Sequence, residues 1–246
     1  MSPPVKKSSQ SLRGKVALIT GAGQGIGLAI ARALAAEGCN LVITSRNKTA
    51  LAKACRELKA KNAHVLPRLC DVRDPVSVHS LITAVKSRFH RLDILINNAG
   101  VAHPNLNVRD LPFDSWREVI DTNLTGMFLI TRDALPLMKS GGVIVNNLSI
   151  AAKRVFAGSS AYNASKHGAL GFTNTLREEL REKGIRVIAL LPGATDTAIW
   201  NTLWPEAPRK KMMQPETVAQ ALVNTLVLPA ESTVEELVIM PSAGML

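Results

Sequence analysis

Tyr162, the single tyrosine of the sequence, stands four residues before Lys166. In a helix, this spacing places both side chains on one face. A phenol has a pKa of about 10 in water, and a neighbouring ammonium favours its ionised form. The pair could therefore work as a general acid and base. Because helix faces that carry a tyrosine and a lysine are common, this interpretation depends on the surrounding residues.

Further polar residues stand where apolar strands are expected to end. Ser149 follows the apolar residues 143–148, and the tetrapeptide Asn97-Asn98-Ala99-Gly100 follows residues 94–96. Parallel strands end at one edge of a sheet, and ligands bind there. Asn123 lies inside a long predicted helix, although asparagine is a poor helix former, which indicates a specific role.

A glycine-rich turn follows the first predicted strand, where residues 20–27 read TGAGQGIG. Glycine lets the backbone approach a ligand closely, and the N-terminus of the following helix favours a pyrophosphate. The GxGxxG pattern does not fit, because Ile26 occupies the place of its third glycine, whereas TGxxxGxG does fit. The turn predicts a dinucleotide site, and the alternative is a tight turn without a ligand.

The end of the second predicted strand indicates which dinucleotide binds. NAD-type sites carry an Asp or Glu about 20 residues beyond the glycines. This chain has no acidic residue from 38 through 56, and Arg46 and Lys48 stand in that segment. An arginine pairs with a 2′-phosphate, which a carboxylate would repel. We therefore predict NADP(H) rather than NAD(H), unless Arg46 merely caps an exposed loop.

Short apolar segments alternate with amphipathic ones, which is typical of an α/β protein with a doubly wound parallel sheet and helices on both faces. One domain over residues 15–246 is expected, after a flexible basic tail at residues 1–14. Residues 195–213 break the rhythm and predict an irregular substrate loop. Seven strands are predicted at residues 16–20, 41–45, 64–70, 94–97, 143–148, 187–191 and 236–240, and helices at 25–37, 49–60, 76–89, 113–138, 161–183 and 215–226.

Composition limits the class of protein. The 246 residues are 46% hydrophobic, and the apolar runs are shorter than the ~18 residues that a membrane span needs. The net charge of +11 comes from scattered residues with few aromatic neighbours, which speaks against nucleic-acid binding. Three cysteines without CxxC spacing argue against a metal site and fit a reducing, cytoplasmic compartment.

Together these motifs resemble the short-chain dehydrogenase/reductase family over residues 15–246. The family's TGxxxGxG lies at residues 20–27 and its NNAG at residues 97–100. Its catalytic Asn, Ser, Tyr and Lys correspond to Asn123, Ser149, Tyr162 and Lys166, and its PG motif corresponds to Pro192-Gly193. The resemblance implies a single-domain Rossmann fold and an NADP(H)-dependent oxidoreductase that acts on a ketone, an aldehyde or the matching alcohol.

The resemblance also implies roles. Tyr162 would exchange a proton with the substrate oxygen that Ser149 holds, while Lys166 would bind the nicotinamide ribose and lower the pKa of Tyr162. Asn123 would support a water that connects Lys166 to solvent. The nicotinamide carboxamide would contact Thr197 and Pro192-Gly193, and the adenine would contact Asp71-Val72. The full cofactor set is Gly21, Gln24, Gly25, Ile26, Gly27, Ser45, Arg46, Asp71, Val72, Asn98, Ala99, Gly100, Tyr162, Lys166, Pro192, Gly193 and Thr197.

The expected substrate pocket is mostly apolar, which favours a neutral or hydrophobic carbonyl compound. It draws on Ala151, Phe156, Trp200 and Trp204, and His103 either lines it or is an ordinary loop histidine. One alternative is a 3-oxoacyl-thioester reductase, because acidic acyl carrier proteins suit a basic surface. Another is an NADP(H)-binding regulatory protein without catalysis. By resemblance, the chain forms a homotetramer, or a dimer, through the helices at 113–138 and 161–183 and the last strand.

Overall fold

A computed structural model describes residues 11–60, 63–229 and 231–244, and these residues contain one sheet of seven strands. Every neighbouring pair is parallel, and the order is β3-β2-β1-β4-β5-β6-β7. This arrangement confirms the predicted doubly wound fold. The strands are β1 (Val16–Ile19), β2 (Asn40–Ser45), β3 (Val65–Leu69), β4 (Ile94–Asn97), β5 (Val143–Asn147), β6 (Arg186–Pro192) and β7 (Glu236–Ile239).

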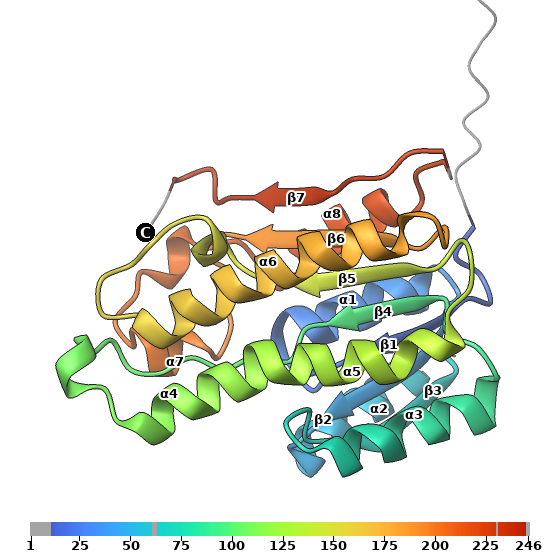
Figure 1. Ribbon diagram of the computed structural model, residues 1–246, viewed down its shortest axis with the longest axis horizontal. Coiled ribbons are helices and arrows are strands. Elements are labelled where there is room, and N and C mark those ends of the chain that lie inside the picture. Colours follow the sequence, from blue (N-terminus) through green and yellow to red (C-terminus); the bar gives the residue numbers. More distant parts are fainter. Residues whose placement is uncertain (1–10, 61–62, 230, 245–246) are drawn as a thin grey trace, which may run out of the picture.

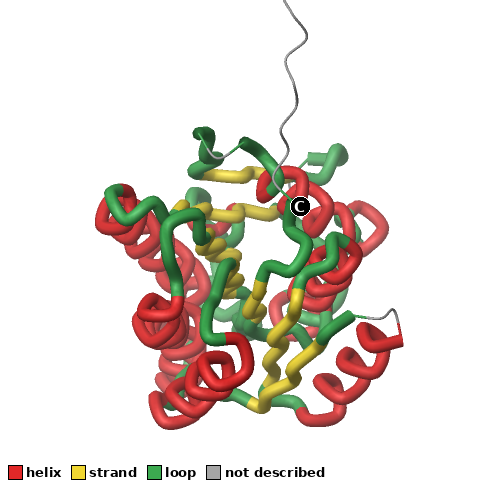
Figure 2. The backbone as a smooth tube through the Cα atoms, turned by 90° about the vertical axis from the view of Figure 1, so that its right-hand side faces the viewer, coloured by secondary structure: helices red, strands yellow, loops and turns green. Residues whose placement is uncertain are grey.

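Helices cover both faces of the sheet (Figures 1 and 2). One face packs against α1 (Gly25–Ala36), α2 (Lys48–Ala60) and α8 (Pro215–Leu226). The other packs against α3 (Pro75–Phe89), α5 (Gly126–Ala134) and α6 (Ser160–Arg181). Side chains of β1 alternate between the two layers, because successive residues of a strand point to opposite faces.

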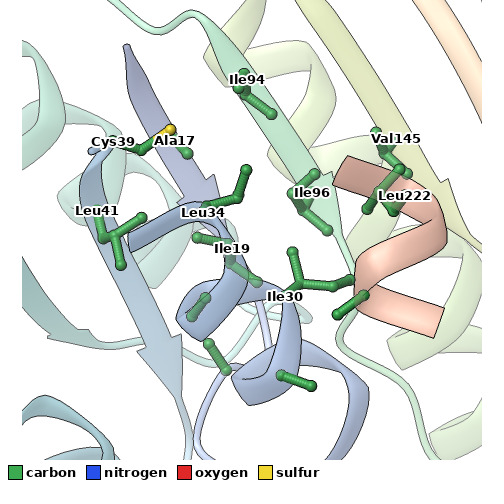
Figure 3. Packing of buried hydrophobic residues seen from close by; sticks show 14 of the residues in the cluster. Ala17, Ile19, Ile30, Leu34, Cys39, Leu41, Ile94, Ile96, Val145 and Leu222 are labelled. Carbon is green, nitrogen blue, oxygen red and sulfur yellow. The ribbon is translucent and has the colours of Figure 1, made fainter. Parts of the chain in front are cut away.

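The layer between the sheet and α1 fixes the turn that follows β1. Figure 3 shows Ile30 and Leu34 of α1 over Ile19 of β1, with Leu222 of α8 beside Ile96. Ile19, Ile30, Leu34 and Ile96 are fully buried. Burial of each such side chain stabilises the fold by about 1.5–3 kcal/mol. Strand β1 and helix α1 are therefore held rigidly on both sides of the glycine-rich turn.

The predicted helix at 113–138 is one continuous rod (Figure 1). It consists of α4 (Phe113–Ile120), a π-helical turn (Asp121–Thr125) and α5, and ends in a 3-10 turn (Leu135–Leu137). Such single π turns within α-helices occur frequently at functional sites. This one contains Asn123, the residue that sequence analysis singled out as unexpected in a helix.

The N-terminal boundary differs from the predicted one. Most of the proposed tail, residues 1–10, lies outside the described residues, as do residues 61–62, 230 and 245–246. Leu12, however, is buried in the layer of α1, and the Gly14 N–H donates to Gly38 O. The packed domain therefore includes residues that the polar composition of the segment assigned to the tail.

Candidate active site

Ser149, Tyr162 and Lys166 come together at the carboxyl edge of the sheet. Ser149 follows β5, and the first turns of α6 carry Tyr162 and Lys166 on one face. The Lys166 Nζ lies 5.5 Å from the centroid of the Tyr162 ring and donates to Asn147 O at 3.2 Å. Ser149 Oγ accepts a hydrogen bond from the Ala151 N–H, which leaves the hydroxyl proton available to another partner.

Burial controls the electrostatics of this group. Burial lowers the pKa of Lys166 from 10.5 to about 8, because desolvation penalises the charged ammonium. Burial raises the pKa of the Tyr162 phenol, while its hydrogen bond with Ser149 acts in the opposite direction. Desolvation outweighs this hydrogen bond, so the pKa of Tyr162 lies above its ordinary value.

Asn123 links three segments through its carboxamide. Its Oδ1 accepts from the Val101 N–H at 2.8 Å, and its Nδ2 donates to Val101 O at 2.9 Å and to Ser165 Oγ at 3.0 Å. The π turn therefore holds the segment after β4 and the first turns of α6 at a fixed separation. The contact to a bridging water that the resemblance implies is a prediction that this geometry does not test.

The glycine-rich turn lies directly against the segment that follows β4. At Gly21 the φ angle is +65°, and a Cβ there would be 2.9 Å from Ala99 Cα. Gly25 has φ +57°, and a Cβ would be 3.3 Å from Thr197 Cγ2 in the loop after β6. Only glycine adopts these left-handed conformations at little cost, so the turn keeps backbone N–H groups open to a ligand.

A cleft of about 950 Å³ runs from this turn to Ser149, Tyr162 and Lys166 and on to the irregular loop after β6. That loop contains α7 (Trp200–Leu203), and the Trp200 Nε1–H donates to Thr195 O. Trp200 therefore both lines the cleft and fastens the loop. The predicted residues that line the cleft are Gly21, Gln24, Gly25, Ile26, Ser45, Arg46, Val72, Asn98, Ala99, Gly100, Ser149, Ala151, Phe156, Tyr162, Lys166, Pro192, Gly193, Thr197, Trp200 and Trp204.

Three predicted site residues and His103 do not line the cleft. Gly27 packs beneath the turn, where a Cβ would lie 2.3 Å from Asn98 Nδ2. The Asp71 carboxylate binds the Arg73 guanidinium at 2.6 Å, and Asn123 acts from behind the wall as described. His103 is buried with its Nδ1 2.7 Å from Pro104 O, so it belongs to the loop interior.

Asn147 and Glu118 are among the cleft residues that sequence analysis did not name. The Asn147 Nδ2 donates to Asn98 Oδ1 at 2.8 Å, and its Oδ1 is buried with no hydrogen-bond partner in the described part of the chain. Its position at the end of β5 could have revealed it, as the same rule found Ser149. Glu118 reaches the cleft from α4, and no local pattern indicates that it lies beside Arg46.

The comparisons with known proteins agree with this geometry. A family model for short chain dehydrogenases matches residues 15–208. The chain belongs to this family. An uncharacterised oxidoreductase of Staphylococcus haemolyticus is 34% identical over 232 residues, which cover 94% of this chain and 98% of that protein. This short-chain dehydrogenase is therefore an oxidoreductase of CH–OH and C=O groups.

Two solved structures are similar along nearly the whole chain. A 3-ketoacyl-(acyl-carrier-protein) reductase from Brucella melitensis, complexed with NADH, is 30% identical with a TM-score of 0.85 and covers 95% of this chain and 99% of its own. An alcohol dehydrogenase from the archaeon Thermococcus sibiricus, complexed with 5-hydroxy-NADP, is 31% identical with a TM-score of 0.87 and covers 94% and 98%. These relatives bind different nicotinamide cofactors, so family membership alone leaves the cofactor preference of this enzyme open.

No helix among the described residues is both long and apolar enough to cross a membrane. Nor do those residues bring three or more His, Cys, Asp or Glu side chains together in a group that could hold a metal ion.

Proposed function

We propose that this enzyme is an NADP(H)-dependent reductase of ketones or aldehydes in which Tyr162 supplies the proton. The observation that carries the proposal is the placement of Ser149, Tyr162 and Lys166 in one cleft with the glycine-rich turn. A binding protein without catalysis has no need of a half-buried tyrosine beside a buried lysine. The same residues would run the reverse reaction, from alcohol to carbonyl.

The residues along the cleft fit a dinucleotide. The N-terminus of α1 offers unpaired N–H groups and a positive dipole to a pyrophosphate, beside a turn where a Cβ would fill the available space. The buried Asn147 Oδ1 lacks a partner in the described chain and can accept a hydrogen bond from a ligand N–H or O–H group. At the other end, Arg46 supplies a cation at the position where NAD-type sites carry an acid, which favours a 2′-phosphate.

The chain's own groups handle the proton. When bound, the reduced nicotinamide supplies the hydride for the carbonyl carbon. Tyr162 donates its hydroxyl proton to the carbonyl oxygen, and its raised pKa keeps that proton in place near neutral pH. Ser149 donates a hydrogen bond to the same oxygen, which is worth about 3 kcal/mol as negative charge develops there. With a pKa of about 8, Lys166 is mostly charged at pH 7 and stabilises the resulting phenolate.

The wall of the substrate end is largely apolar. Ala151, Phe156, Trp200, Leu203 and Trp204 line it. This lining supports a neutral or hydrophobic carbonyl compound. A 3-oxoacyl thioester is the second candidate, because of the structural likeness to a 3-ketoacyl-(acyl-carrier-protein) reductase and the net charge of +11.

The test measures the loss of reduced-cofactor absorbance with NADPH and with NADH over simple ketones, aldehydes and an acetoacetyl thioester. We expect faster turnover with NADPH, which Tyr162→Phe abolishes while NADPH binding, followed by fluorescence, persists. Ser160→Ala is the matched control, because it also removes a hydroxyl from the first turn of α6. The buried Ser160 hydroxyl has no hydrogen-bond partner among the described residues. Binding without turnover on any substrate would contradict the proposal and favour a regulatory protein.

We also propose a homotetramer in the cytoplasm. Exposed apolar side chains on the outer helices and the edge strand support assembly: Trp116 on α4, Phe128 on α5 and Val238 on β7. Cys39, Cys55 and Cys70 are free thiols, which suits a reducing compartment. Elution as a monomer at micromolar concentration in size-exclusion chromatography with light scattering would contradict the assembly.

A further inference from the structure

An ion cluster stands at the end of the cleft that lies beside β2 and β3. Arg46 follows β2, Arg73 follows β3, and Glu118 projects toward both from α4. The Glu118 carboxylate lies 3.6 Å from the Arg46 guanidinium and 3.9 Å from that of Arg73. Arg46 and Glu118 both line the cleft. Two cations that follow different strands therefore converge on the Glu118 carboxylate, and a second carboxylate, that of Asp71, binds Arg73.

The two arginines are bound to different degrees. Arg73 also binds Asp71 with hydrogen bonds of 2.6–3.1 Å, so its guanidinium is fixed beside β3. Within the described residues, Arg46 has Glu118 as its one ion-pair partner, and their separation of 3.6 Å exceeds a normal hydrogen bond. Both side chains are more than a third exposed, which leaves them free to exchange partners.

Glu118 therefore occupies the position of an anion between two arginines. We propose that Arg46 and Arg73 form the site for the 2′-phosphate of the cofactor, and that the Glu118 carboxylate is its internal counter-ion, which competes with that phosphate. The inference rests on the proposed NADP(H) dependence. It adds Glu118 as a residue that sets how strongly the enzyme prefers NADPH to NADH. Glu118 would repel a 2′-phosphate and leave a 2′-hydroxyl almost unaffected, so it narrows the preference for NADPH over NADH.

The experiment compares Glu118→Gln with the wild type by measuring the Kd of NADPH and of NADH from cofactor fluorescence. Glu118→Gln keeps the shape of the side chain and removes its charge. We expect NADPH to bind about three- to tenfold more tightly, as loss of one repulsion near 4 Å at an exposed site implies, and the Kd of NADH to change less than about twofold. Asp114→Asn is the matched control. It removes one charge from the first turn of the same helix, at a residue outside the cleft and without an ion pair among the described residues.

Two further measurements separate this charge effect from a structural one. The gain should also appear for adenosine 2′,5′-bisphosphate and be absent for AMP, because these probes differ in the 2′-phosphate. It should shrink between about 0.05 M and 1 M NaCl, as screening removes the repulsion. Arg46→Gln alone should bind NADPH more weakly than the wild type. Adding Glu118→Gln to this variant should increase the affinity for NADPH by a smaller factor than Glu118→Gln does in the wild type.

Each outcome has a distinct meaning. An equal gain in affinity for NADPH and NADH would show that Glu118 repels the whole dinucleotide. Unchanged Kd values for both cofactors would show that Glu118 does not act on either of them. Either result overturns this inference and leaves the reductase intact. If the wild type binds neither cofactor at millimolar concentration, the proposed function fails and the inference fails with it.

Discussion

Substitution of Lys166 by methionine should change how the free energy of unfolding depends on pH. The pKa of Lys166 is about 8 in the folded enzyme and 10.5 ordinarily. Between these values the unfolded chain binds more protons than the folded one, so stability rises with pH. The cost of the buried charge is fully present below pH 8 and is gone above pH 10.5. The difference of about 2.5 in pKa corresponds to about 3.4 kcal/mol.

Only part of that free energy is recovered in a convenient range. Integration of the proton linkage from pH 7 to pH 9 gives a gain of about 1.3 kcal/mol for the wild type relative to Lys166→Met. Urea unfolding of both proteins at pH 7, 8 and 9, at constant ionic strength, measures this difference. Burial raises the pKa values of the Cys39 and Cys70 thiols, so these thiols decrease the stability of the fold as pH rises. This decrease is the same in both proteins and cancels in the difference.

Parallel stability curves for the two proteins over this range would refute the reasoning. They would mean that the ammonium is as well solvated in the folded enzyme as in the unfolded chain, and Lys166 would then carry its ordinary pKa. Methionine changes packing as well as charge, so the absolute stability of Lys166→Met does not report the buried charge. The pH dependence of the difference in unfolding free energy between the two proteins does report it.

Three further substitutions test the framework of the site. Asn123→Ala leaves the Val101 N–H and C=O without their partners, and urea unfolding should show a loss of about 2–5 kcal/mol, whereas an unchanged midpoint would contradict the role of the π turn. Gly21→Ala forces a left-handed alanine against Ala99 Cα at 2.9 Å, so it should cost about 2–4 kcal/mol and weaken NADPH binding in fluorescence titration. Arg209→Met removes hydrogen bonds to Asp196 Oδ1 and Thr197 O, so the loop after β6 should be cut faster by chymotrypsin, and equal cutting rates would disprove this latch.

Local patterns were sufficient for the fold and for the residues at strand ends. The alternation of apolar segments predicted all seven strands, because each buried strand and each amphipathic helix carries its own periodicity. Ser149, Tyr162 and the glycine-rich turn were found for the same reason: their positions follow from the element that precedes or contains them. These rules act over a few residues, so one sequence is enough to apply them.

Contacts between distant segments were not predictable in this way. Glu118 reaches Arg46 across 72 positions of the chain, and its helix is amphipathic with or without that contact. Leu12 lies in a polar stretch, and only tertiary packing makes it part of the core. The raised pKa of Tyr162 was also not predictable, because the sequence shows the neighbouring Lys166 but not how far burial desolvates the phenol.

The asparagines at the strand ends connect the two halves of the site. The Asn98 Nδ2 donates to Thr20 O at the start of the glycine-rich turn, and its Oδ1 accepts from Asn147. The backbone carbonyl of Asn147 in turn accepts a hydrogen bond from the Lys166 ammonium. Three hydrogen bonds thus lead from the turn beside α1 to the lysine of α6, across the ends of β4 and β5. Because β1, β4 and β5 are neighbours in the sheet, this chain of contacts needs no flexible segment. The position of the Lys166 ammonium beside the proposed proton donor is therefore fixed by the same framework that fixes the proposed cofactor site.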